Sequence, residues 1–487
     1  MNHDGEFFRP SLCDDRMKKI TAKDLQHLTD AELINKELLK RRPISGISTD
    51  SRAVAKGDLF FALKGENFDA HNFIDTVVKA EAAAIVVHRE WAQKNDLYFR
   101  TFPCAFIIVN DTTVAFGELA RIYRRKFELP IIAIGGSNGK TTTKEMVTAV
   151  LRMKYNVLNT QGNLNNHIGV PQTLFRLRSN HDAAVVEIGT NHFGELKYLC
   201  SIAEPTHGLI TNIGKEHLEF FGDEEGVAKE EKELFRYLKE NGGTAFVNCD
   251  DKFLAGDSLS IKKSFCYGVV SKADIRAKKV ELNELGHASF DAVWQKKSVS
   301  FVVRLSVPGM HNVTNALAAV AVGLKMKVKP KKIAEALTKF TSASKRMEVV
   351  SQNGIVILND TYNSNPDSVI AALKTLKSFR NDGKKVVVLG DMRELGETSK
   401  REHTNIGVIV AETNFDMLCT VGPFSKYTSE AFGNGAVHFE SKDALTAHLK
   451  RVLKHGDVVL VKGSRGMKME EVVNQLVNQN GKADIKE

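Results

Sequence analysis

Short apolar runs recur along this chain, and polar residues and stretches of helical spacing separate them. A continuous apolar run of this length is typical of a strand buried on both faces of a sheet. Strands that alternate with helices predict a mostly parallel, doubly wound sheet, so the expected fold class is α/β. The clearest runs are residues 58–63, 83–87, 105–109, 183–188, 208–213, 385–390, 417–422 and 457–463.

The spacing of these runs divides the chain into several regions. A small α/β region ends near residue 110, a helical stretch near 112–127 follows, and a third region begins past about residue 330. With 487 residues, the chain is long enough for about two to four domains. We expect domains over residues 17–110, 111–328 and 329–487.

The first sixteen residues look detached from the first domain. The sequence from Met17 resembles the beginning of a protein chain, and Thr21 is a plausible N-cap for a helix shortly after it. We expect residues 1–16 to be disordered or a misassigned start, with an ordered arm as the alternative.

A glycine-rich turn follows the apolar run at residues 131–134 and leads into a helical pattern that opens with Lys140 and Thr141. Small residues let a backbone close around phosphate oxygens, and the helix N-terminus adds N–H donors. In such a loop Lys140 would reach the β- and γ-phosphates, and the Thr141 hydroxyl would hold Mg²⁺. The first glycine of the commoner, longer pattern would fall at Ile134, so this loop is the short form from Gly136 to Thr141. The sequence therefore predicts use of a nucleoside triphosphate, the alternative being a turn that merely contains glycines.

Composition places the chain among globular cytoplasmic proteins. It is 43% hydrophobic, and none of its apolar runs approaches the roughly 18–20 residues that span a bilayer. The polar N-terminus does not resemble a secretory signal. Free cytosolic thiols fit the scattered cysteines better than disulfides or a zinc site does. These cysteines are Cys13, Cys104, Cys200, Cys249, Cys266 and Cys419.

The formal net charge of +9 suits a partner that carries phosphates. Its basic residues are dispersed, without the basic stripe and interleaved aromatic residues that bind single-stranded nucleic acid. A phosphate-bearing small substrate is therefore favoured over nucleic acid.

Two further groups in the middle region follow predicted strands. Glu187 ends one apolar run, and His217 lies shortly after another. In open α/β sheets, ligands bind at the carboxyl ends of strands, so both side chains are candidates for a metal near the phosphate loop. A carboxylate suits Mg²⁺ well, whereas histidine is the less usual ligand. Taken singly, each group is more often a hydrogen-bonded structural residue.

From about residue 17 to the C-terminus, several separated motifs together resemble the Mur ligase family of peptidoglycan synthesis. Residues 48–52 with 57–62 resemble its uridine-nucleotide-binding domain, and residues 136–141 match its short phosphate loop. The segment 360–368 is similar to that of the dipeptide-adding member, in place of the histidine-containing form usual in the third-residue-adding ligase. The other similar segments are residues 163–171, 309–316, 345–348 and 462–465.

The resemblance implies a three-domain α/β architecture, with a central P-loop ATPase domain and a C-terminal Rossmann-like domain that binds nucleotide and dipeptide. It implies an ATP- and Mg²⁺-dependent ligase that activates the terminal carboxylate of UDP-N-acetylmuramoyl-tripeptide as an acyl phosphate. The amine of D-alanyl-D-alanine then attacks this intermediate. These two substrates are the expected partners, and we expect a monomer without a nucleic-acid partner or a membrane span.

The resemblance also assigns expected roles to individual residues. Lys140, Glu187, His217, Glu231 and Arg346 are the expected catalytic residues. Nucleotide contacts are expected from Gly136, Ser137, Asn138, Gly139, Lys140, Thr141, Thr142, Asn312, Asn315, Arg346 and Asp360. Substrate contacts are expected from Ser51, Arg52, Asn163, Asn166, His167, Asn363, Asn365 and Ser464, and metal contacts from Thr141, Glu187, His217 and Glu231. Taken alone, Arg346 could equally be an ion pair at a domain linker, and Asp360 a helix cap or turn residue.

The sequence departs from the family pattern at one position. Members usually carry a carbamylated lysine after the metal histidine, and a gapless count from His217 places Glu231 there. We expect Glu231 to supply directly the anionic oxygens of the carbamate, so that no carbon dioxide is needed. A register shift toward Lys229 or Lys232, or a solvated charged helix, is the alternative.

Other functions share part of this pattern. Another Mur ligase or a folate polyglutamylating enzyme would share the architecture of the central ATPase domain. The uridine-binding type of the first domain argues against the folate enzyme. A P-loop regulatory or transport ATPase would not need two flanking domains with small-ligand motifs. Lysine and diaminopimelate both remain open as the third residue of the peptide substrate.

Overall fold

The computed structural model describes residues 17–65, 68–96, 101–342 and 344–477. Two compact units divide the chain. The first contains residues up to 133, 155–189 and 195–206, and the second contains residues 134–154, 190–194 and 207 onward. The expectation for residues 1–16 lies outside the described residues.

The first unit opens with a five-stranded sheet in the order β1-β5-β4-β3-β2, in which β1 is antiparallel and the others are parallel. Its strands are β1 (Glu32–Ile34), β2 (Gly46–Ser48), β3 (Asp58–Phe61), β4 (Ala84–His88) and β5 (Ala105–Val109). The connecting helices are α1 (Ala22–Gln26), α2 (Leu38–Arg41), η1 (Ala70–Phe73), α3 (Ile74–Lys79) and α4 (Arg89–Lys94), and α6 (Thr112–Arg124) follows β5. Thr21 caps α1 in a reciprocal capping box with Asp24, which confirms the predicted cap.

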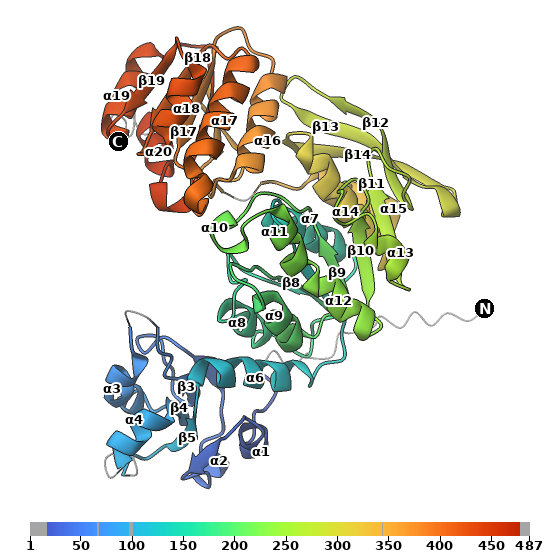
Figure 1. Cartoon of the computed structure of the whole chain (residues 1–487). Coiled ribbons are helices and arrows are strands. Elements are labelled where there is room, and N and C mark those ends of the chain that lie inside the picture. The colour runs from blue at the N-terminus through green and yellow to red at the C-terminus, as the bar shows by residue number, and fades with distance from the viewer. Residues whose placement is uncertain (1–16, 66–67, 97–100, 343, 478–487) are drawn as a thin grey trace, which may run out of the picture. The chain divides into compact units, whose positions relative to one another are not determined.

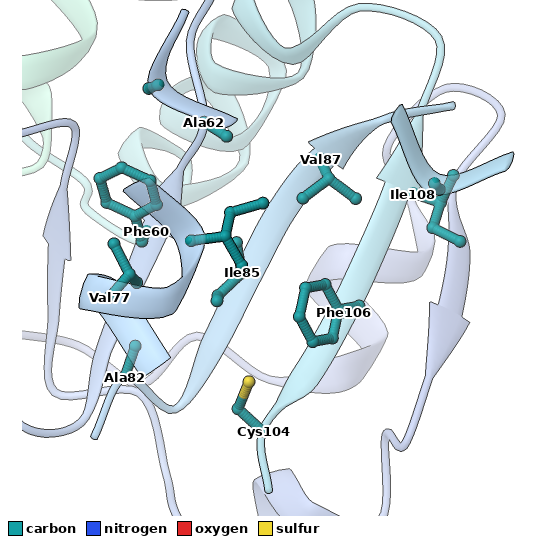
Figure 2. Close-up of a cluster of buried hydrophobic side chains, with 12 residues drawn as sticks. Phe60, Ala62, Val77, Ala82, Ile85, Val87, Cys104, Phe106 and Ile108 are labelled. Carbon is teal, nitrogen blue, oxygen red and sulfur yellow. The ribbon is translucent and has the colours of Figure 1, made fainter. Parts of the chain in front are cut away.

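The core of this sheet follows directly from its apolar runs. Figure 2 shows Phe60, Ile85 and Phe106, from three adjacent strands, pointing to the same side as Val77 of α3. All four are fully buried. Alternate residues of each strand supply this layer because strand side chains alternate between the two faces of a sheet.

The central sheet has the strand order β14-β13-β12-β11-β10-β9-β6-β8-β7. Strand β6 (Ile131–Gly135) delivers the glycine-rich turn, and it belongs partly to each unit. In the first unit lie β7 (Val157–Asn159), β8 (Ala183–Glu187), α8 (Gly169–Leu174) and α9 (Glu195–Ala203). The second unit contains β9 (His207–Ile210), β10 (Thr244–Asn248), β11 (Ser264–Gly268), β12 (Ile275–Leu282), β13 (His287–Trp294) and β14 (Val299–Pro308).

Helices of the second unit pack around its strands (Figure 1). Helix α14 is almost entirely buried between α7 and strands β10 to β13, as its long apolar sequence requires. The helices here are α7 (Lys140–Arg152), α10 (Leu218–Phe221), α11 (Glu224–Glu231), α12 (Glu233–Glu240), α13 (Asp257–Ser260), η2 (Gln295–Lys297), α14 (His311–Lys325) and α15 (Pro330–Thr338).

The end of the second unit is a six-stranded sheet in the order β15-β16-β20-β17-β18-β19. All its pairs are parallel except the edge pair of β15 and β16, as the doubly wound prediction requires. Its strands are β15 (Glu348–Gln352), β16 (Ile355–Asp360), β17 (Lys385–Gly390), β18 (Met417–Val421), β19 (Ala436–Phe439) and β20 (Val458–Lys462). Its helices are α16 (Pro366–Ser378), η3 (Gly396–Thr398), α17 (Ser399–Glu412), α18 (Ser425–Phe432), α19 (Lys442–Val452), η4 (Arg465–Met467) and α20 (Glu470–Val477).

The structure also contains an element without a counterpart among the predicted strands. Strands β12, β13 and β14 form an antiparallel meander, and residues of β13 alternate between buried and half-buried. Such a half-buried sheet carries no continuous apolar run. Among the described residues, Cys104 and Cys419 are buried free thiols, and none of the helices is both long and apolar enough to cross a membrane.

Candidate functional site

The predicted phosphate loop joins β6 to α7 in the second unit. Its backbone is held by the segment after β9: the Ser137 N–H donates to the Asn212 carbonyl at 2.9 Å. The Asn138 N–H donates to Asn212 Oδ1 at 3.0 Å, and Asn212 Nδ2 donates back to the Asn138 carbonyl at 2.8 Å. Thr141, at the start of α7, is buried, and Thr142 is half-buried. The loop is therefore anchored before any ligand binds.

Two glycines of the loop are required by their conformation and by close neighbours. Gly136 has φ +112° and Gly139 has φ +81°, both in the region that L side chains rarely adopt. A Cβ at Gly136 would lie 2.3 Å from Thr211 Oγ1, and one at Gly139 would lie 2.7 Å from Asn315 Oδ1. The glycine spacing in the sequence thus reflects two positions where the backbone turns tightly against a neighbouring segment.

Lys140 points back into the loop. Its Nζ donates to the Gly136 carbonyl and lies 3.1 Å from Glu216 Oε2, and only 15% of the side chain is exposed. Glu216 is buried, and its second oxygen, Oε1, has no hydrogen-bond partner among the described residues. A positive charge held over a narrow backbone turn suits the binding of phosphate groups.

Glu231, the residue at the expected carbamate position, reaches the same loop. Its Oε2 accepts a hydrogen bond from the Gly136 N–H at 2.7 Å, and the residue has no exposed surface. Burial raises the pKa of Glu231 to about 8, although the positive charge of Lys140 acts in the opposite direction. Its second oxygen, Oε1, is buried without a hydrogen-bond partner in the part of the chain described. At pH 7 a carboxyl group with this pKa is mostly protonated, and a cation bound beside it would favour the carboxylate form.

The neighbouring lysines are directed elsewhere. Lys232 Nζ pairs with Asp257 Oδ2 at 3.0 Å, and Lys229 Nζ lies 5.4 Å from the centre of the Phe193 ring. Both contacts support Glu231, rather than a shifted lysine, as the residue that faces the phosphate loop.

His217 lies at the start of α10 in a left-handed conformation, with φ +47°. Its Nδ1 is 2.8 Å from Glu394 Oε2, so it contacts the segment that follows β17. The described residues contain no group of three His, Cys, Asp or Glu side chains placed to hold a metal ion.

Glu187 belongs to the first unit, at the end of β8. It is buried, its N–H donates to Thr160 Oγ1 at 3.0 Å, and its Oε1 accepts from Asn165 Nδ2 at 3.0 Å. Asn165 was not among the predicted site residues, although it lies in the same segment as Asn163, Asn166 and His167, which are exposed. The Asn166 side chain accepts the N–H groups of Ile168 and Gly169, so it also shapes the start of α8.

The predicted uridine-side residues also lie in the first unit. Arg52 forms a two-pronged ion pair with Asp50, at 2.9 and 2.7 Å, and its side chain is exposed. This contact lowers the pKa of Asp50 to about 2. Ser51 between them is half-buried, and Thr49 Oγ1 accepts from Gln172 Nε2 at 3.2 Å. The segment therefore presents a fixed guanidinium at the surface of the unit.

Asn312 and Asn315 lie one turn apart on α14, and both are buried. Asn315 Nδ2 donates to Asn312 Oδ1 at 3.0 Å, and Asn312 Nδ2 donates to the Pro308 carbonyl at 2.7 Å. Since Asn315 also lies against Gly139, the helix reaches the phosphate loop.

The remaining predicted residues gather at the carboxyl ends of β16 and β20. Asp360 accepts from Lys462 Nζ at 2.6 Å and from the Met347 N–H at 3.1 Å, so it is paired and is not a helix cap. The Arg346 guanidinium stacks 3.7 Å from the centre of the Tyr362 ring. This contact is a cation–π interaction rather than an ion pair.

Three further predicted residues lie close by. Asn365 caps α16 through Oδ1, which accepts the Ser368 N–H, and its Nδ2 donates to Asn138 Oδ1 in the phosphate loop at 3.0 Å. The Ser464 hydroxyl donates to the Ser364 carbonyl at 3.1 Å, and the exposed Asn363 accepts from the Arg465 N–H at 3.4 Å. The structure therefore joins these segments to the loop through Asn365.

Sequence reasoning missed several residues of this region. Glu216 and Glu394 face Lys140 and His217, and Tyr362 and Lys462 hold Arg346 and Asp360. Tyr362 and Lys462 lie inside quoted motifs and Glu216 is next to His217, so proximity in sequence was the available signal for these three, whereas no quoted motif points to Glu394. Their partners are distant in the chain, and only the fold brings them together.

Comparison with known proteins identifies the family of this chain. Three family descriptions match the chain: the Mur ligase family, catalytic domain, over residues 43–124; the Mur ligase middle domain, over 134–323; and the Mur ligase, glutamate ligase domain, over 345–465. Together they cover most of the chain and include the phosphate loop and the segments around Arg346 and Asp360.

Individual relatives match over nearly the whole length. The chain is 36% identical to the UDP-N-acetylmuramoyl-tripeptide–D-alanyl-D-alanine ligase of Escherichia coli, over 96% of this chain and 100% of the relative. It is 34% identical to the enzyme of that name from Bacillus subtilis, over 95% and 99%.

Solved structures also match over nearly the whole length of the chain. MurF from Acinetobacter baumannii superposes with a TM-score of 0.85 at 34% identity, over 95% of this chain and 99% of that one. MurF ligase from Thermotoga maritima in complex with ADP gives a TM-score of 0.77 at 28% identity, over 90% and 97%. Full-length matches at this level of identity share more than a fold. The chain belongs to the Mur ligase family.

Proposed function

We propose that this chain is an ATP-dependent ligase that joins D-alanyl-D-alanine to UDP-N-acetylmuramoyl-tripeptide in peptidoglycan synthesis. The observation that carries the proposal is an anchored phosphate loop, with Lys140 and Glu231 against it, in a chain that matches ligases of that activity along nearly its whole length.

The geometry supports a role for the loop in ATP binding. Lys140 and the N-terminus of α7 supply positive charge where the phosphates would lie, and Asn315 lies behind Gly139. Phosphoryl transfer depends on positioning and electrostatic stabilisation, because the protein has little covalent chemistry to perform. The tripeptide carboxylate attacks the γ-phosphorus, ADP leaves, and the acyl phosphate forms. The dipeptide amine then attacks the acyl carbon, and inorganic phosphate leaves.

Residues of this chain also fit Mg²⁺. Among the described residues, the buried Oε1 atoms of Glu231 and Glu216 have no hydrogen-bond partner, and carboxylate oxygens are the ligands a hard cation prefers. We assign Thr141, Glu187, His217 and Glu231 as the residues that would hold it, with Glu231 replacing a carbamylated lysine. Bound Mg²⁺ would neutralise charge that develops on the transferred phosphoryl group.

The remaining assignments follow the predicted roles. Arg346 and Asp360 would contact the nucleotide, Ser51 and Arg52 the uridine part of the substrate, and the domains would extend over residues 17–110, 111–328 and 329–487. The enzyme would act as a cytoplasmic monomer.

The experiment that tests the function is an amide-formation assay with ATP, Mg²⁺ and tripeptide substrates that carry either lysine or diaminopimelate. We expect phosphate release that requires both the nucleotide-linked tripeptide and D-alanyl-D-alanine. ATP turnover that is unchanged when either substrate is omitted would instead indicate a regulatory ATPase.

A further inference from the structure

Residues 325–332, where α14 leads into α15 in the second unit, form a strongly basic surface segment that we call the lysine segment. Five of its eight residues are lysines, and all five are exposed: Lys325, Lys327, Lys329, Lys331 and Lys332. None of these lysines belongs to the phosphate loop or to the other sites predicted from the sequence. Their charge therefore needs a separate explanation.

Most of this charge is not neutralised within the described ranges. Lys332 Nζ lies 2.9 Å from Glu335 Oε2, and the other oxygen of Glu335 pairs with Lys339 at 3.0 Å. The four remaining lysines of the segment form no ion pair with a described residue. Like charges so close together repel one another unless dissolved ions or an anionic partner screen them. The segment is therefore a site of uncompensated positive charge.

Two further lysines add to the charge beside the segment. Lys154, just past the end of α7, donates through Nζ to the Lys327 carbonyl at 3.2 Å. The exposed Lys263 donates to a backbone carbonyl at 2.8 Å. Burial lowers the pKa of His207, and Lys325 and Lys263 both act in the same direction, so these two lysines lie near the same imidazole. Bonds to carbonyls do not remove the positive charge of either amine.

Helix stability does not account for the placement of these lysines. Lys325 lies in the last turn of α14, where a positive charge is favourable because helix C-termini carry partial negative charge. Lys329, in contrast, is the N-cap residue of α15, and Lys331 lies in its first turn, which holds no acidic residue. Positive charge at that end opposes the helix dipole and lowers helix stability. This cost indicates a role in binding.

The lysine segment lies at the opposite end of the helices that reach the phosphate loop. Helix α7 starts at the loop with Lys140, and α14 places Asn315 against Gly139 near its own start. With 15 residues, α14 is about 22 Å long at the usual helical rise. A partner bound at the lysine segment is therefore separated from the phosphate loop by the length of this helix.

We propose that the lysine segment, together with Lys154 and Lys263, docks this protein on an anionic lipid surface. Lysine is a compact charge on a flexible stem and needs no fixed partner geometry, which suits mobile phosphate headgroups. The segment contains no arginine and no aromatic residue. Nucleic-acid recognition relies on arginine forks and aromatic stacking, so this composition favours lipid over RNA or DNA. The proposal does not depend on the proposed ligase reaction.

Vesicle sedimentation with the full chain tests the proposal. Binding is measured to vesicles that mix phosphatidylglycerol with phosphatidylcholine, and to vesicles of phosphatidylcholine alone, at low and at high salt. We expect binding only to the anionic vesicles, and weaker binding at high salt because salt screens exposed charges.

The variant that carries Lys327→Gln, Lys329→Gln and Lys331→Gln should bind the anionic vesicles roughly 100-fold more weakly, which corresponds to about fivefold for each lysine. Its melting temperature should not fall, because Lys329 and Lys331 oppose the dipole of α15. Its ATP-dependent activity without vesicles should equal that of the unaltered chain.

The matched control replaces Lys272, Lys374 and Lys384 by glutamine, since these three exposed lysines lie outside the segment and their loss changes the net charge equally. Equal loss of vesicle binding in the two triple variants would overturn the proposal, because net charge alone would then explain the affinity. Failure of the unaltered chain to bind the anionic vesicles would also overturn it. Tighter binding of RNA or duplex DNA than of these vesicles at equal phosphate concentration, lost in the first variant, would assign the segment to nucleic acid instead.

Discussion

The backbone N–H of Gly136 donates to Glu231 Oε2 at 2.7 Å, so the last residue of α11 holds the turn that opens the phosphate loop. The two residues are 95 positions apart in the chain. The carboxyl is completely buried, and its other oxygen is unpartnered among the described residues. A substitution at position 231 would therefore change both the conformation of the phosphate loop and the charge beside it.

The first prediction concerns the need for carbon dioxide. Because the Glu231 side chain itself supplies the carboxyl oxygens, ligase activity of the unaltered enzyme should not change when bicarbonate is added. Glu231→Lys should regain activity only with bicarbonate, which would carbamylate the new lysine. Glu231→Ala should lose most activity, whereas Lys229→Ala and Lys232→Ala should retain it. A fully active Glu231→Ala enzyme would exclude the assignment of Glu231.

Lys140→Met should remove the charge that stabilises the transferred phosphoryl group. We expect kcat for ADP formation to fall by about 10³-fold, the usual scale for a preorganised electrostatic contact. Lys252→Met serves as the control, since that side chain is 72% exposed and lies over Phe253. Comparable activity of the Lys140 and Lys252 variants would argue against phosphoryl transfer at this loop.

Asn365→Asp should separate helix capping from contact with the loop. Aspartate keeps the oxygen that accepts the Ser368 N–H, and it caps helices about as well as asparagine. It lacks the N–H that donates to Asn138 Oδ1, so kcat/KM for ATP should fall by about tenfold while the melting temperature stays unchanged. Ser368→Ala, which removes the reciprocal cap, should instead lower the melting temperature and keep kcat/KM. Matching losses of stability in both variants would leave no separate role for the contact with Asn138.

Phe106→Ala should destabilise the first sheet. The ring is completely buried beside Ile85 (Figure 2), and truncation of a buried phenylalanine costs about 3–5 kcal/mol. Hydrogen exchange at the amides of β4 and β5 should report this loss. Val114→Ala is the control, because Val114 is 41% exposed and its truncation should change stability by about 0.5 kcal/mol or less. Equal exchange rates in both variants would contradict the core assignment.

His207 should make stability depend on pH below neutrality. Burial lowers the pKa of His207 to about 4, and the nearby Lys325 and Lys263 act in the same direction. In the unfolded chain the imidazole takes up a proton at about pH 6.5. Between pH 6.5 and 4 the unfolded state therefore binds more protons, and stability falls as the pH falls. Melting temperatures from pH 7.5 to 4.5 should drop more steeply for the unaltered protein than for His207→Gln. Parallel curves would contradict this.

Much of the fold could be predicted from apolar runs alone. The runs at 105–109 and 385–390 are strands β5 and β17 with unchanged bounds, because strands buried on both faces need a continuous apolar sequence. The helix near 112–127 is α6, which ends three residues earlier, at Arg124. The meander of β12 to β14 was not predicted, because its half-buried strands alternate in character and match no continuous run.

The sequence by itself determined the phosphate loop, since a short glycine pattern between a buried strand and a helix permits few other structures. The sequence also placed Glu231 at the position where the family carries a carbamylated lysine, because counting residues from His217 requires no structure. Only the tertiary structure decided what those residues touch. Glu231 meets Gly136, Asn365 meets Asn138, and Lys154 meets Lys327, although each pair is far apart in the chain. Such contacts depend on how strands and helices pack, and local sequence carries no record of that packing.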